Sequence, residues 1–164
     1  MAVDTYTPLF SEVLNRVAKL KTKNEKIEHL RKYNNDSLRM IIKSSFDPKI
    51  EWELPEGDVP YTKNDAPEGT EHNVLAHESR KLYHFIKGGN PQITQNKREA
   101  MFVQMLEGLH EDEAKLLVAA KDKKLHQVYK GLSANVVKTA FNWTDEYMVE
   151  EVNYPQTPGM ASGG

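Results

Sequence analysis

Residues 9–46 read LFSEVLNRVAKLKTKNEKIEHLRKYNNDSLRMIIKSSF, and this stretch decides the fold. Its apolar residues recur at steps of three and four, which is the spacing of one face of a helix. Capping residues predict helix starts at three places: Thr7 with Pro8, Thr22 with Glu25, and Asn35 or Asp36. Because the turns between them are very short, the three amphipathic helices are expected to fold back on one another.

Helical periodicity returns further along the chain and predicts segments over 74–86, 95–106, 110–120 and 133–141. The expected starts of the last three are Thr94 or Gln95, His110 or its neighbour, and Ser133. The acidic residues 111–113 fall in a first turn, where they interact favourably with the helix dipole. We therefore predict an all-α protein with a single compact domain of six to seven helices over residues 1–150. A shared core is predicted for ten apolar residues: Phe10, Val13, Val17, Leu30, Leu38, Ile42, Leu82, Met105, Leu117 and Val137.

Two segments are predicted to be irregular. Prolines and glycines exclude regular helix from residue 47 to 69, and this acidic loop is long enough to be either functional or partly disordered. Residues 151–164 contain prolines, glycines and few large apolar side chains, so we expect a disordered tail there.

The composition excludes several classes of protein. With 38% apolar and 28% charged residues, the chain has the balance of an ordinary soluble protein. No apolar run approaches the roughly 20 residues that a membrane-spanning helix needs, and the N-terminus lacks a signal-peptide pattern, so a cytoplasmic location is expected. The absence of cysteine excludes disulfides, thiolate nucleophiles and cysteine-based metal sites.

No catalytic motif is present: the phosphate-loop, nucleophile-elbow and zinc-helix patterns are all missing. Glu107 and His110 have the spacing of half a di-iron site, but a second copy on a facing helix is lacking, and His110 is interpreted as an ordinary helix-start residue. We therefore predict a protein that is not an enzyme, with no catalytic residue, no metal ligand and no cofactor.

Charge is distributed unevenly along a chain whose net charge is only −2. Residues 19–49 and 115–138 are rich in lysine, whereas residues 51–78 are strongly acidic. Local field matters more than net charge for attracting a polyanion, although lysines also serve simply to solvate exposed helix faces. The basic run ends in Lys130-Gly131-Leu132-Ser133, where the unpaired N–H groups of a helix start and nearby ammonium groups form the local chemistry of a phosphate site.

With these segments placed, residues 9–46 and 111–143 resemble the all-helical N-terminal DNA-binding domain of ATP-dependent DNA ligases, especially those of tailed phages. The resemblance rests on the order and lengths of the first three helices, and on an acidic, leucine-containing helix followed by a basic connection into Gly131-Leu132-Ser133. The whole chain also resembles short tailed-phage proteins of unknown activity, which implies a phage origin. In the ligase family this domain grips duplex DNA across the minor groove through phosphates on both sides of a nick. The matching positions here, which the resemblance implies as DNA-binding, are Thr22, Lys23, Lys26, Lys130, Gly131, Ser133 and Lys138.

One departure from the ligases decides the predicted function. Their catalytic domain carries a nucleophilic lysine in the motif K-x-D-G, and this motif is absent here. We therefore predict a non-catalytic protein that binds the phosphate backbone of duplex or nicked DNA. The alternatives are a protein–protein adaptor that contacts a phage or host protein through its acidic loop, and a virion component.

Overall fold

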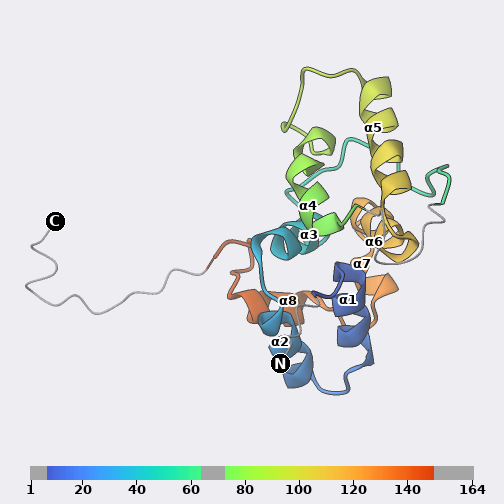
Figure 1. The fold of residues 1–164 in the computed structure, drawn as a ribbon. Helices are drawn as coiled ribbons and strands as arrows, with labels where there is room; N and C mark the ends of the chain where they lie inside the picture. Colours follow the sequence, from blue (N-terminus) through green and yellow to red (C-terminus); the bar gives the residue numbers. More distant parts are fainter. Residues whose placement is uncertain (1–6, 64–72, 150–164) are drawn as a thin grey trace, which may run out of the picture.

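The structure is a computed structural model that describes residues 7–63 and 73–149 (Figure 1). Within these ranges the chain forms eight α-helices, one 3-10 helix and no β-strand, which confirms the predicted all-α domain. None of these helices is long and apolar enough to cross a membrane. The elements are α1 (Phe10–Lys19), α2 (Lys23–Lys32), α3 (Asp36–Phe46), α4 (Leu75–Glu78), η1 (Ser79–Phe85), α5 (Gln95–Gly108), α6 (Glu111–Lys121), α7 (Leu125–Val128) and α8 (Ala134–Phe141).

Most helix starts lie where their capping residues predict them. Thr22 and Glu25 form a reciprocal capping box at the start of α2. Oxygen atoms of Asn35, Thr94 and Ser133 accept backbone N–H groups at the starts of α3, α5 and α8. The predicted start at Thr7 and Pro8 is wrong: α1 is capped at Leu9, whose N–H donates to Oε1 of Glu12 at 2.8 Å.

The structure differs from the predicted helices in two places. The segment predicted as one helix over 74–86 forms the single turn α4 followed by the 3-10 helix η1. The basic connection after α6 contains the short helix α7, whose start has no side-chain cap and was not predicted. These two changes explain why more than six or seven helices are present.

Residues 47–63 of the acidic loop contain no helix, as their prolines and glycines predict. Trp52 forms an isolated antiparallel bridge with Ile86. The N–H of Glu53 donates to the carbonyl of Phe85 at 2.7 Å, so the loop is fastened to the end of η1. Residues 64–69 of the predicted loop and the predicted tail over 151–164 lie outside the described residues.

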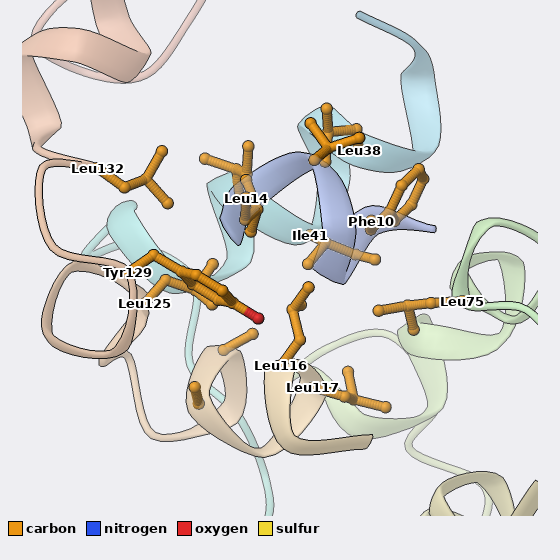
Figure 2. Close-up of a cluster of buried hydrophobic side chains, with 14 of the residues drawn as sticks. Phe10, Leu14, Leu38, Ile41, Leu75, Leu116, Leu117, Leu125, Tyr129 and Leu132 are labelled. Atoms are coloured by element: carbon orange, nitrogen blue, oxygen red, sulfur yellow. The ribbon is translucent and has the colours of Figure 1, made fainter. Parts of the chain in front are cut away.

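The core is a single cluster of buried apolar side chains contributed by helices from both halves of the chain. All ten residues predicted to share a core belong to it, which confirms that prediction. Figure 2 shows side chains of α1, α3 and α6 meeting in this cluster. In Figure 1, α5 lies at one end of the molecule and α2 with α8 at the other, so surfaces formed by these two ends are well separated.

The side chain of Glu113 is buried inside this helical assembly. It lies in the first turn of α6, as predicted, but only 1% of the residue is exposed. Its Oε1 accepts the N–H of Leu75 at 2.9 Å and its Oε2 accepts the N–H of Phe10 at 3.1 Å. One carboxylate therefore joins the starts of α1, α4 and α6, and burial raises the pKa of Glu113.

Candidate nucleic-acid interface

Helices α2 and α8 pack side by side and run in the same direction. Near their C-terminal ends, the guanidinium of Arg31 donates to the carbonyls of Ala140 at 3.2 Å and Thr139 at 3.0 Å. Near their N-terminal ends, the side chain of Lys26 lies against Gly131. The starts of both helices therefore lie close together, where the positive ends of their dipoles add.

Lys26 connects α2 to the end of α1 and lies against the turn before α8. Its Nζ donates to the carbonyl of Val17 at 2.9 Å and also to the carbonyl of Leu20, so it satisfies the C-terminus of α1. The ammonium group of Lys26 therefore already serves two backbone carbonyls, and its predicted contact with phosphate stays a prediction.

Gly131 is required by the same arrangement. Its φ of +92° lies in the left-handed region. A Cβ atom at this position would also lie only 2.8 Å from Cε of Lys26. The glycine therefore allows the chain to turn into α8 directly beneath the lysine side chain.

The start of α8 borders an open hollow. Oγ of Ser133 accepts the N–H of Val136 at 3.2 Å, so Ser133 caps the helix. The hollow, of about 410 Å³, lies beside this start and is lined by Phe46, His126, Gly131, Leu132, Ser133 and Ala134. Its lining is largely apolar. Such a lining suits the apolar face of a deoxyribose or a base better than it suits a free ion.

Exposed lysines surround the two helix starts. Lys19 ends α1, Lys21 lies in the turn, Lys23 opens α2, and Lys130 precedes Gly131. All four are exposed, and none of their ammonium groups forms an ion pair or a hydrogen bond within residues 7–63 and 73–149. Sequence reasoning named Lys23 and Lys130 but missed Lys19 and Lys21, although both lie in the basic run that begins at residue 19.

Lys138 lies within α8, more than one turn after its start, and its ammonium group has two partners. Its Nζ lies 3.3 Å from Oδ1 of Asp145 and 5.1 Å from the ring centre of Tyr147. Residues after α8 fold back and bring these two partners to Lys138, whose predicted contact with phosphate stays a prediction.

His29 reports the positive field along α2. Its pKa is lowered, first by burial and then by the charges of Arg16 and Lys32. Its Nε2 is buried and has no hydrogen-bond partner among the described residues. Burial is therefore the main reason for the lowered pKa, and the two nearby cations add to it.

His110 caps α6, as its position in the sequence predicts: its Nδ1 accepts the N–H of Asp112 at 3.2 Å. Within residues 7–63 and 73–149, no three side chains of the metal-binding types gather closely enough to hold a metal ion.

Together these features define an all-helical, single-domain protein with a basic end built from two helix starts. The chain belongs to a protein family described as "Family of unknown function (DUF6433)", which it matches over residues 13–127. The match includes Thr22, Lys23 and Lys26 and ends before Lys130 and α8. Comparisons with curated proteins and with solved structures find no match.

Proposed function

We propose that this protein binds the phosphate backbone of duplex or nicked DNA and performs no chemistry on it. The observation that carries the proposal is the parallel packing of α2 and α8, which brings two helix starts to one end of the molecule. Free backbone N–H groups at such starts and the aligned dipoles favour anions. The four exposed lysines at this end supply the charge that attracts a polyanion over longer distances.

The proposed contacts divide into two kinds. Lys19, Lys21, Lys23 and Lys130 act as point charges on phosphates, whereas Thr22, Gly131 and Ser133 shape the two helix starts. Backbone contacts of this kind fix position and carry no sequence information, so we expect little preference between DNA sequences.

The resemblance to the DNA-binding domain of ATP-dependent ligases supports the same proposal, because its matched segments contain both helix starts. It also favours a phage-encoded protein acting in the host cytoplasm. The adaptor role remains a second candidate, favoured by a groove beside the acidic loop that is described in the next subsection. Within residues 7–63 and 73–149 no feature favours a virion component.

The proposal is tested by measuring affinity for nicked, intact and single-stranded DNA over a range of salt concentrations. If the four lysines each neutralise one phosphate, affinity for duplex DNA should fall by roughly 150-fold between about 50 and 200 mM salt. Affinity that is absent at low salt, or that does not change with salt, would contradict the proposal.

We also predict that the protein forms no covalent adduct with ATP. The lysine of K-x-D-G that ligases adenylate has no counterpart in the sequence. Incubation with labelled ATP, followed by denaturing electrophoresis, should leave the protein unlabelled under conditions in which an intact ligase becomes labelled. A stable lysine–AMP species would overturn the non-catalytic part of the proposal.

A further inference from the structure

A groove lies between the acidic loop and α5. Figure 1 shows α5 at the end of the molecule away from α2. Leu54, Val59 and Pro60 of the loop form one wall, and Phe102 and Val103 of α5 form the other. The groove holds about 240 Å³, which is below the roughly 300–1,000 Å³ of small-molecule sites. Its size therefore suits one large side chain and its flanking backbone.

The loop wall of this groove is held rigidly by a buried lysine. The side chain of Lys121 is only 1% exposed, and its Nζ donates to the carbonyls of Pro55 at 2.6 Å and Gly57 at 3.1 Å. Oδ1 of Asp122 lies 2.5 Å from the same Nζ and accepts the N–H of Gly57 at 3.1 Å. A buried charge is costly unless it is paired and hydrogen-bonded, as this one is. The loop is thus pre-organised before any partner arrives, which lowers the entropic cost of binding.

The rim of the groove is negatively charged. Asp58 and Glu99 both line it, and neither has an ion pair among the described residues. The positive charge of Lys121 is balanced internally by Asp122 and is buried. Carboxylates at this rim repel nucleic acid and attract a cationic ligand.

We propose that this groove binds a segment of a protein partner that presents one large apolar side chain next to lysine or arginine. The apolar walls accept the side chain, the fixed loop sets its position, and the two rim carboxylates meet the flanking cations. The proposal does not rest on DNA binding, because one wall of the groove is α5, which lies at the other end of the molecule from α2 and α8 (Figure 1).

The test uses a library of displayed random peptides selected on the intact protein. Enriched peptides should combine a large apolar residue with adjacent lysine or arginine. Val103→Trp, which fills the groove, should abolish their binding. The double variant Asp58→Asn/Glu99→Gln keeps the side-chain shapes and should weaken binding roughly two- to thirtyfold, the range for losing two exposed ion pairs.

A matched control removes the same charge elsewhere. Asp112→Asn/Glu146→Gln alters two exposed acids outside the groove and should leave peptide affinity unchanged. If Val103→Trp fails to fold, the Asp58→Asn/Glu99→Gln variant still decides the question. Peptides that lack the apolar–basic pattern, or that bind the control and groove variants equally, would overturn the proposal. A wild-type dimer in sedimentation that Val103→Trp dissociates would also overturn it, because a second copy would then be the occupant.

Discussion

The slope of log DNA affinity against log salt is expected to flatten by about 3–4 units when glutamine replaces four exposed lysines: Lys19, Lys21, Lys23 and Lys130. Each cation that neutralises a phosphate of B-DNA releases counterions and contributes roughly 0.9 to this slope. Single substitutions should each flatten it by about one unit. Fluorescence anisotropy with a labelled duplex, recorded over a salt series for wild type and variants, gives the slopes directly.

A charge-matched control separates local contacts from net charge. Glutamine at four exposed lysines of η1, α5, α6 and the η1–α5 connection lowers the net charge by the same amount: Lys81, Lys87, Lys97 and Lys115. Lys87 and Lys115 form ion pairs near the surface, which contribute little to stability, whereas Lys81 pairs with Glu78, whose side chain is only 11% exposed. The control should keep the wild-type slope. If both quadruple variants flatten the slope equally, the binding is diffuse and the basic end formed by α2 and α8 is not the site.

The helices were predictable because their signals are local. A capping oxygen and an apolar stripe act within a few residues, so Thr22, Asn35, Thr94 and Ser133 identify helix starts without knowledge of the fold. The division of 74–86 into α4 and η1 has no such signal. Leu82 and Phe85 are buried whether the backbone is α-helical or 3-10, and apolar spacing does not distinguish the two over so few turns.

The candidate site was predictable only in part. Lys23 and Lys130 each lie beside a helix start, as their positions in the sequence predict. The partners of an ammonium group depend on tertiary packing instead. The carbonyls that Lys26 binds lie in the last turn of α1 and directly after it, and the carboxylate that Lys138 contacts follows α8. A long flexible lysine side chain can reach many different partners, and the sequence alone does not show which of them it contacts.

Glu113 is the clearest case of an acidic side chain whose role the sequence conceals. Its place in a first turn predicts an exposed acid that favours the helix dipole, yet it accepts buried N–H groups from two other helices. Substitution by alanine should lower the free energy of unfolding by about 2–6 kcal/mol, because the N–H groups of Phe10 and Leu75 each lose their acceptor at about 1–3 kcal/mol. Urea denaturation measures the change. The exposed neighbour variant Asp112→Ala should cost no more than about 1 kcal/mol.

The stability cost of Glu113→Gln should change with pH, and the direction of that change tests whether burial raises the pKa of Glu113. Burial raises the pKa of Glu113 above its usual 4.5 in the folded state, so the native protein holds a proton that the unfolded chain has released. Stability from this group is therefore complete below pH 4.5 and decreases as pH rises toward the raised pKa. Glutamine cannot titrate and offers one oxygen to two N–H donors, so its cost relative to wild type should be largest at acidic pH and shrink toward neutrality. A cost that instead grows with pH would mean that the two N–H groups stabilise the carboxylate more than burial penalises it, and that the pKa of Glu113 is lowered.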